Sequence, residues 1–223
     1  MARATRATRT GGTGSAADFL PERITLPALR RAAAGCRGCH LWKVGTQTVF
    51  GEGKRTATVM FVGEQPGDQE DRAGHPFVGP SGRLLDGALE RAGLDRGDAY
   101  VTNAVKHFKW VPDPSGKRRI HKTPMQRHIA ACHVWLEGEL ARERPAVIVT
   151  LGATALAAVY GSRISITEAR SRKLEDPAGT PILATYHPSA ILRAPDHEAR
   201  AKLRATLVAD LQRAAQRADN AAG

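Results

Sequence analysis

The segment GKRRIHKTP, residues 116–124, combines four fixed positive charges with one histidine. The charges belong to Lys117, Arg118, Arg119 and Lys122, and His121 lies among them. Such a run is typical of a solvated surface loop. It is also suited to contact a phosphate backbone, since Lys and Arg supply the charges that neutralise phosphates. In this second interpretation the loop sits on the phosphate backbone and directs the His121 imidazole at a bound group.

Three cysteines are the other chemically distinctive side chains. Cys36 and Cys39 form a C-x-x-C pair, and Cys132 lies far along the chain. Because three is both too few and an odd number for a disulfide framework, we expect a reducing, cytoplasmic setting. The C-x-x-C spacing indicates either a metal-binding pair or a redox pair.

The overall charge favours a nucleic acid as the partner. The chain of 223 residues contains 33 Lys and Arg against 22 Asp and Glu, which gives a net charge of +11. An excess of this size is typical of proteins that bind nucleic acids. No apolar run approaches the roughly 18 residues of a membrane span, so we expect no membrane insertion.

The length is that of one domain, and nothing in the sequence indicates more than a monomer. We expect residues 1–20 to form a disordered basic tail. This segment is rich in Arg and Thr, and it lacks the apolar stretch of a secretory signal. A single domain is expected over residues 21–218, followed by a short tail over 219–223.

Segments with the patterns of strands and helices alternate along the chain. Buried strands are expected at 57–63, 99–105, 145–152 and 181–186. Helices are expected at 81–93, 124–142, 153–160 and 196–218. This alternation predicts an α/β fold, with three layers in the order α/β/α and a central, mostly parallel sheet.

Polar segments follow the expected strands and would meet at one edge of the sheet, where ligands bind in such folds. They are GEQPGDQED, the stretch from KHFKW to KRRIH, GAT, and HPS. The glycines of the first segment either allow close approach of a ligand or form a plain turn. Its carboxylates are Glu64, Asp68, Glu70 and Asp71. Phe77, farther along, either stacks on a ligand or folds back onto the core.

Taken together, these segments resemble one protein family. GEQPGDQED, PFVGPSGRLLD, VTNAVKHFKW, KRRIH and HPSAILR, in this order, are similar to the iron–sulfur branch, family 4, of the uracil-DNA glycosylase superfamily. Within this branch they resemble the UdgX group, which attaches itself covalently to uracil-containing DNA. CRGCHLW and TQTVFGEG extend the resemblance to about residues 30–215. It implies the glycosylase fold, excision of uracil, and uracil-containing DNA, preferably single-stranded, as the partner.

The resemblance also implies roles for individual residues. A glycosylase flips its base into a pocket and stabilises that base as it departs with negative charge. Phe77 would stack on uracil, Asn103 would pair with its amide edge, and His187 would donate to the oxygen that gains charge. Considered singly, Asn103 could equally end a turn, and His187 could be an ordinary loop histidine. The other substrate-binding residues would be Gly63, Gln65, Pro66, Gly67, Asp68 and Ser189.

By the UdgX resemblance, His121 attacks the sugar carbon that the base leaves. In ordinary family members, a carboxylate near the Glu64 position would help a water molecule to attack instead. Here Glu64 would stabilise the positive sugar or take the imidazole proton. We expect neighbouring cations to lower the pKa of His121 and to keep it neutral. The flanking phosphates would be held by Lys117, Arg118, Arg119 and Lys122.

Two other functions stay open at this point. The first is a conventional multiple-turnover uracil-DNA glycosylase in which His121 only contacts phosphate. The second is a metal-containing DNA-binding protein without catalytic activity.

The resemblance finally implies a structural cofactor. Its ligands would be Cys36, Cys39, His107 and Cys132, with His107 at a position where the broader family has a cysteine. Three thiolates and one imidazole can hold a [4Fe–4S] cluster, which the family favours, and the same set also suits structural Zn²⁺.

Overall fold

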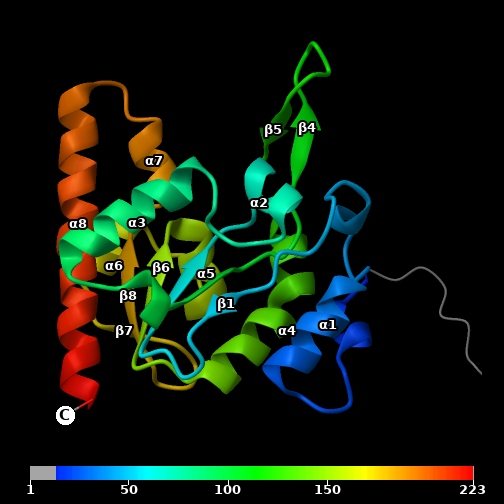
Figure 1. Cartoon of the computed structure of the whole chain (residues 1–223), viewed down its shortest axis with the longest axis horizontal. Coiled ribbons are helices and arrows are strands. Elements are labelled where there is room, and N and C mark those ends of the chain that lie inside the picture. The colour runs from blue at the N-terminus through cyan, green and yellow to red at the C-terminus, as the bar shows by residue number, and fades with distance from the viewer. Residues whose placement is uncertain (1–13, 223) are drawn as a thin grey trace, which may run out of the picture.

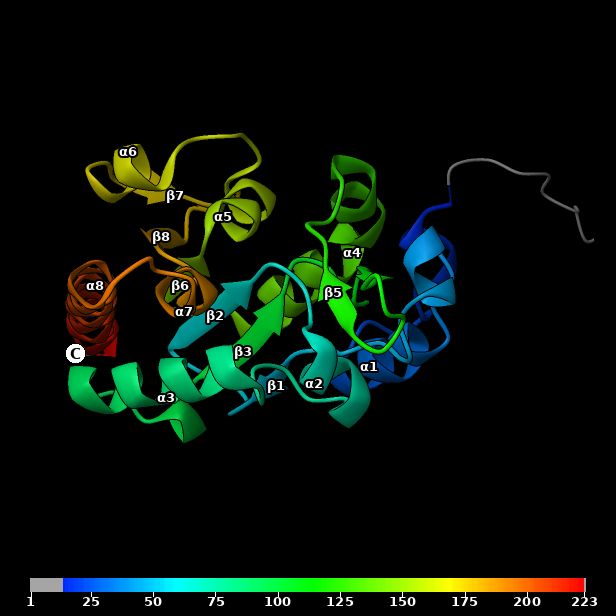
Figure 2. The ribbon, with the colours of Figure 1, turned by 90° about the horizontal axis from the view of Figure 1, so that it is seen from above.

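A six-stranded sheet forms the centre of the computed structural model, which describes residues 14–222. The strands, in spatial order, are β1 (Glu52–Gly53), β3 (Tyr100–Asn103), β2 (Val59–Gly63), β6 (Val147–Leu151), β8 (Pro181–Thr185) and β7 (Leu174–Glu175). The four middle strands are parallel, whereas β1 and β7 pair antiparallel at the two edges. Helices cover both faces of the sheet (Figures 1 and 2). The predicted three-layer α/β/α fold with a mostly parallel sheet is therefore confirmed.

Each face of the sheet packs against its own group of helices. One group consists of α1 (Leu26–Ala34), α4 (Gln126–Glu143), α5 (Ala153–Tyr160) and α6 (Ile166–Arg170). The other consists of α3 (Pro80–Ala92), α7 (Pro188–Leu192) and α8 (His197–Ala222). Along β2, Met60 and Val62 belong to the first cluster, and Val59 and Phe61 to the second, because successive side chains of a strand point to opposite faces.

The basic segment forms a hairpin rather than the predicted loop. β4 (Trp110–Pro112) pairs antiparallel with β5 (Arg119–His121) outside the main sheet, with Val111 opposite Ile120. Figure 1 shows this hairpin projecting from the body above the short helix α2 (Asp68–Ala73). The remaining elements are the 3₁₀ turns η1 (Ala16–Phe19), η2 (His40–Lys43) and η3 (Arg96–Asp98).

The ordered chain extends farther than predicted at both ends. η1 lies within the segment expected to be disordered, and Ala16 is only 1 % exposed there because it packs in the core. The rest of that predicted tail, residues 1–13, lies outside the described residues. α8 continues through most of the predicted 219–223 tail, as far as Ala222. No helix within residues 14–222 is long and apolar enough to cross a membrane.

A buried ion pair joins the end of β3 to α4. Nζ of Lys106 lies 2.5 Å from Oε2 of Glu139, and both side chains are completely buried. Lys106 also donates to Oγ1 of Thr102 and to the carbonyl of Asn103. Glu139 accepts a further hydrogen bond from the amide of Gly51. Both charges are thus compensated, and the network holds the backbone at the point where β3 ends.

Removing one partner of this pair should destabilise the fold strongly. Lys106→Met leaves the Glu139 carboxylate buried without its cation, for which we expect a loss of about 3–5 kcal/mol in the free energy of unfolding. Urea denaturation of this variant, of Glu139→Gln and of the double variant gives the coupling energy. The double variant should lose less than the sum of the two single losses. Simple additivity would contradict an energetic link between the two side chains.

Candidate active site

The loops after β2 and β6 meet at the carboxyl edge of the sheet. The chain leaves these neighbouring strands toward opposite sides, which places a ligand crevice between them. Oγ1 of Thr154, just after β6, donates a 2.5 Å hydrogen bond to Oε2 of Glu64, just after β2. The other carboxylate oxygen of Glu64, Oε1, lies 3.5 Å from Nε2 of His121. The hydrogen bond across the crevice therefore orients the carboxylate toward the histidine.

Gly63 ends β2 beneath two side chains that were predicted to hold a base. A Cβ at this position would lie 2.4 Å from Oδ1 of Asn103 and 2.5 Å from Cζ of Phe77, so only glycine fits there. Asn103 is 2 % exposed, and its Oδ1 has no hydrogen-bond partner within the described residues. Leaving a buried amide oxygen unpaired costs free energy unless a ligand N–H reaches it. The arrangement suits a planar ring that carries an N–H on its edge.

The backbone of Phe77 is strained. Its φ of +55° lies in the left-handed region, which costs a bulky residue about 1–2 kcal/mol. Gly82 of α3 packs directly on the carbonyl of Phe77, and a Cβ at Gly82 would lie 1.7 Å from that oxygen. The ring is 6 % exposed and belongs to the core cluster of α3 and α8. Phe77 thus packs on the core, as one of the two predicted alternatives has it, while its ring lines the end of β2.

His187 lies beside Phe77, with 6.0 Å between the ring centroids. Its Nδ1 accepts the backbone N–H of Ser189 at the start of α7. Burial, assisted by the positive charge of Arg193, lowers the pKa of His187 to about 4. The ring is therefore neutral at pH 7 and carries its proton on Nε2, which makes that atom a hydrogen-bond donor.

His121 is more exposed than His187, with 47 % of its side chain accessible. Partial burial lowers the pKa of His121, and the positive charges of Arg193 and Lys109 act in the same direction, whereas the Glu64 carboxylate opposes them. The direction of this shift agrees with the sequence-based expectation, but its leading cause is burial. The contributing cations come from outside the 117–119 run. Arg193, Lys109 and Thr154 were not among the predicted site residues, although Arg193 closes the HPSAILR motif.

Gln65 fastens the hairpin to the loop after β2. Its Nε2 donates to the carbonyls of Lys109 and Lys122, and its Oε1 accepts the N–H of Lys109. These two backbone segments flank the hairpin that carries His121. Gln65 was predicted to bind substrate, but hairpin backbone occupies both ends of its amide. It acts here as a positioning residue.

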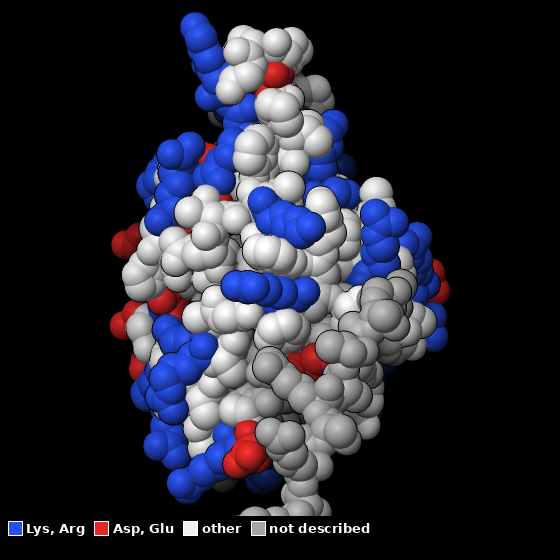
Figure 3. Space-filling model, turned by 90° about the vertical axis from the view of Figure 1, so that its right-hand side faces the viewer, with Lys and Arg blue, Asp and Glu red and all other residues white. Residues whose placement is uncertain are grey.

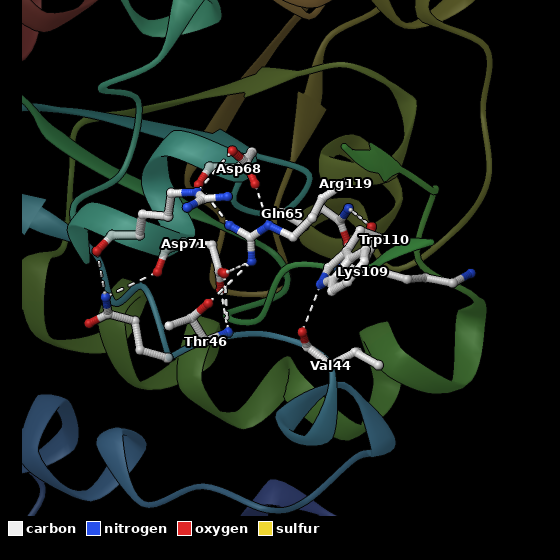
Figure 4. A network of polar contacts seen from close by, with 10 residues as sticks. Val44, Thr46, Gln65, Asp68, Asp71, Lys109, Trp110 and Arg119 are labelled. Atoms are coloured by element: carbon white, nitrogen blue, oxygen red, sulfur yellow. Dashed lines mark hydrogen bonds and ion pairs between the residues drawn. The ribbon is translucent and has the colours of Figure 1, made fainter. Parts of the chain in front are cut away.

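Arg119 differs from its predicted role as a phosphate contact. Its guanidinium bonds to the carboxylates of Asp68 and Asp71, and only 13 % of the side chain is exposed (Figure 4). It also lies 5.3 Å from the ring centroid of Phe108 and 5.5 Å from that of Trp110. Carboxylates and rings thus surround the charge, so Arg119 joins the hairpin to α2 instead of facing solvent. Asp68, predicted to bind substrate, serves the same connection.

Comparison of the chain with known protein families agrees with this site. The model of the Uracil DNA glycosylase superfamily matches residues 50–212, which contain the crevice, the hairpin and α7. The chain belongs to the uracil DNA glycosylase superfamily. The match confirms the superfamily part of the resemblance seen in the sequence.

Curated members of the uracil DNA glycosylase superfamily are similar over most of their length. A Type-4 uracil-DNA glycosylase of Thermotoga maritima is 37% identical over 180 residues, or 80% of this chain and 87% of the relative. That of Pyrobaculum aerophilum is 35% identical over 183 residues, covering 77% and 87%. That of Archaeoglobus fulgidus is 34% identical over 178 residues, covering 77% and 85%.

The exposed charges of the hairpin are Lys117, Arg118 and Lys122. The backbone N–H groups of Lys117 and Arg118 bond to Oδ1 of Asp113, which shapes the turn and leaves both side chains outward. Figure 3 shows Lys and Arg side chains on the hairpin where it rises above the body. Of the other predicted pocket residues, Pro66 and Gly67 lead from Gln65 into α2.

The three cysteine side chains share one region of the core beside α1 and α4. Burial, with smaller contributions from Cys39 and Cys36, raises the pKa of the Cys132 thiol to about 12, although the charge and the backbone N–H of Lys106 act in the opposite direction. The N–H of Lys106 donates to Sγ of Cys132, and the indole of Trp135 donates to Sγ of Cys36. Buried cysteine sulfurs that accept hydrogen bonds from N–H groups are suited to hold an iron–sulfur cluster.

His107 is buried two residues after Val105, at 5 % exposure, and burial lowers its pKa to about 4. It is therefore neutral, as a ligand must be. Within residues 14–222, however, no group of three or more His, Cys, Asp or Glu side chains is arranged to hold a metal ion. The donor types thus fit the predicted cofactor, while the ligand set stays a prediction.

The different surroundings of Arg118 and Arg119 should separate their effects. Arg119→Ala leaves the buried Asp71 carboxylate without its cation, and we expect a loss of about 3 kcal/mol in the free energy of unfolding. Arg118→Ala should leave stability unchanged and should lower the slope of log affinity for single-stranded DNA against log salt by about 0.7. Urea denaturation and binding titrations at several salt concentrations measure both. Equal urea midpoints for the two variants would contradict the assigned role of Arg119.

Proposed function

We propose that this protein excises uracil from DNA and that His121 then bonds covalently to the abasic sugar, as in the UdgX group. The observation that supports excision most strongly is the unpaired, buried Oδ1 of Asn103, which lies beside the Phe77 ring and near a neutral His187. The names of the Type-4 relatives support uracil excision. The covalent step is supported by the KRRIH segment and by the place of His121 next to Glu64.

The pocket selects uracil through the polarity of its edge. Uracil carries an N–H at N3, which would meet Oδ1 of Asn103, whereas cytosine carries a lone pair there and would repel that oxygen. The amide nitrogen of Asn103 can donate to the adjacent uracil carbonyl. Phe77 stacks on the flipped ring, and Gly63 allows the ring to approach the end of β2. Pro66, Gly67, Asp68 and Ser189 complete the pocket wall in this proposal.

Bond breaking separates opposite charges within the site. The electron pair of the bond between C1′ and N1 leaves with uracil, and the sugar becomes positively charged. Nε2–H of His187 donates to the uracil oxygen that gains charge and stabilises the leaving anion. The carboxylate of Glu64, which Thr154 orients, stabilises the positive sugar.

His121 can bond to the positively charged sugar because its imidazole is neutral. The lone pair of Nε2 forms a bond to C1′, and the imidazole then releases the proton of its other nitrogen to solvent. The uracil anion takes up one proton, so the step consumes only the histidine and the DNA. A sugar bonded to an imidazole nitrogen has no neighbouring nucleophile to displace it, so turnover ends after one event.

The hairpin places the strand for this attack. Lys117, Arg118 and Lys122 contact the phosphates that flank the flipped nucleotide, while Arg119 and Gln65 hold the hairpin against the loop after β2. We propose that the protein acts as a monomer with one catalytic domain and that it prefers single-stranded DNA, in which the base needs no unpairing.

A conventional multiple-turnover glycosylase is the second candidate. The identity to Type-4 relatives favours it, and Glu64 could direct a water molecule to C1′ in place of His121. In that case His121 would contact phosphate only. A DNA-binding protein without catalysis would leave the unpaired oxygen of Asn103 without a purpose.

We also propose a [4Fe–4S] cluster bound by Cys36, Cys39, His107 and Cys132, with zinc as the minor alternative. The cluster is structural, because base excision transfers no electron. It would tie η2 and the loop after β3 to α4, and the three thiols would bind it as thiolates.

A denaturing gel tests the covalent step. Incubation with a uracil-containing single-stranded oligonucleotide should give a protein–DNA band that survives heat and detergent, and free uracil should appear in equal amount. His121→Ser should abolish this band, because a serine hydroxyl is shorter than the imidazole and a much weaker nucleophile.

The control is Asn103→Ala, which should abolish both the band and uracil release. Uracil release in excess of protein, without a band, would favour the conventional glycosylase. A band that persists in His121→Ser would show that another residue is the nucleophile. Absence of uracil under all conditions would leave DNA binding alone.

Metal analysis tests the cluster. The purified protein should be brown and should contain iron and acid-labile sulfide in equal amounts. Cys132→Ser should lose both, whereas His107→Cys should keep them, because a thiolate can replace the imidazole as a ligand. Zinc without iron in protein purified under anaerobic conditions would contradict the cluster.

A further inference from the structure

A basic groove lies along the outer side of α3 and α8. It begins near the catalytic crevice and leads away from it. Its larger part, a hollow of about 630 Å³, is lined by Arg91, Arg200, Arg204 and His197 among others. A second hollow of about 290 Å³ shares Arg91 and Arg204 with it and adds Arg83, Gly87 and Leu192. α3, α7 and α8 pack against one another here, as Figures 1 and 2 show. The two hollows therefore form one groove, which we call the α3–α8 groove.

The groove exists because small residues line its floor. Ala201, Ala205 and Ala209 repeat every four residues along α8 in the larger hollow, and Gly87 and Ala88 of α3 line the smaller hollow. Residues four apart lie on one face of a helix, so these positions form a stripe without bulk. Arginine side chains rise on both sides of this stripe. The result is a channel with an apolar floor and positively charged walls.

Charge is strongly one-sided in the α3–α8 groove. Among the described residues, no Asp or Glu lines either hollow. Two carboxylates of the same helices are engaged elsewhere: Asp86 pairs with Arg96, and the buried Asp210 pairs with Arg170 and Arg213. Four exposed guanidinium groups and one histidine therefore face a single solvent channel. Such a concentration of one charge attracts an anion with several charges.

The groove begins next to the catalytic residues. Leu192, which lines its smaller hollow, is followed directly by Arg193, whose charge reaches both His187 and His121. Along α8 the lining extends from His197 to Gln212, which corresponds to about 22 Å at 1.5 Å per residue. At 3.4 Å per nucleotide in a stacked strand, this length accommodates about six nucleotides.

We propose that the α3–α8 groove binds the DNA strand that leaves the active site on one side of the uracil. This inference rests on the proposed function, because it assumes that DNA occupies the crevice. The arginines contact successive phosphates without reading bases, which extends the footprint well beyond the flipped nucleotide. The site thereby distinguishes uracil within a longer strand from uracil near a strand end.

Gly87 offers a test that removes no arginine. It is exposed in the middle of α3, and nothing lies within 4 Å of the position of a Cβ. Arg83 and Arg91 lie four residues before and after it, so the single carboxylate of Gly87→Glu would pair with one or the other and would cancel one of the two positive charges. Gly87→Gln places a side chain of the same size without charge, and Gly87→Ala is the control for helix stability. All three should fold at least as well as the parent chain, since glycine is unfavourable within a helix.

The experiment compares equilibrium binding of two thymine-containing single strands at several salt concentrations. One strand spans only the crevice, and the other is longer by about six nucleotides on each side. On the long strand, Gly87→Glu should lower the slope of log affinity against log salt by about 0.7 relative to Gly87→Gln, which represents one phosphate contact. On the short strand the two variants should have equal slopes. Arg91→Glu with Arg204→Glu removes two phosphate contacts and should lower the slope on the long strand by about 1.4.

Equal slopes of Gly87→Glu and Gly87→Gln on the long strand would overturn the groove as a DNA track. An equal loss on both strands would also overturn it, because the charge would then act on the crevice itself. Uracil release by the parent protein from a short strand with uracil in place of thymine tests the proposed function separately. Its absence would refute excision, whereas the comparison of slopes would still decide whether the groove binds DNA.

Discussion

The position of the β4–β5 hairpin depends on a few polar bonds to the loop after β2, and the catalytic geometry depends on that position. The hairpin shares no strand pairing with the main sheet, so the sheet does not locate His121. Gln65 bonds to the backbone on both sides of the hairpin, and Arg119 connects it to two carboxylates of α2. Because Gln65 directly follows Glu64, the same turn of chain sets both the carboxylate and the histidine that faces it.

Two histidines have different surroundings that suit different chemistry. His187 is held at the start of α7 with Nδ1 occupied by a backbone N–H, so its other nitrogen is a fixed donor. His121 lies half exposed at the end of β5, where a strand of DNA can reach its ring. Both have lowered pKa values because of burial and the charge of Arg193, and both are therefore neutral at pH 7. One site thus holds a fixed N–H donor and a second, neutral imidazole, which are the two groups that the proposed excision and capture require.

The core strands and helices could be predicted from the sequence because their patterns are local. The four parallel strands and the helices α3, α4, α5 and α8 begin and end within a few residues of their expected ranges. The short edge strands β1 and β7 could not be predicted, since two residues carry no periodicity. The hairpin was missed because charged residues dominate the 116–124 segment, and β5 is identified as a strand by its pairing with β4, in which Val111 lies opposite Ile120.

The sequence alone determined the chemistry at the strand ends: an amide, a histidine and a carboxylate that end or follow strands of the main sheet and so must share one of its edges. Tertiary structure decided which charges face solvent. Arg118 and Arg119 are adjacent and chemically identical, yet one is exposed while the other is enclosed by Asp68 and Asp71 from another part of the chain. A basic run in a sequence carries no information on such distant partners. Successive side chains of extended backbone point to opposite sides, so Arg119 meets the two carboxylates and Arg118 does not.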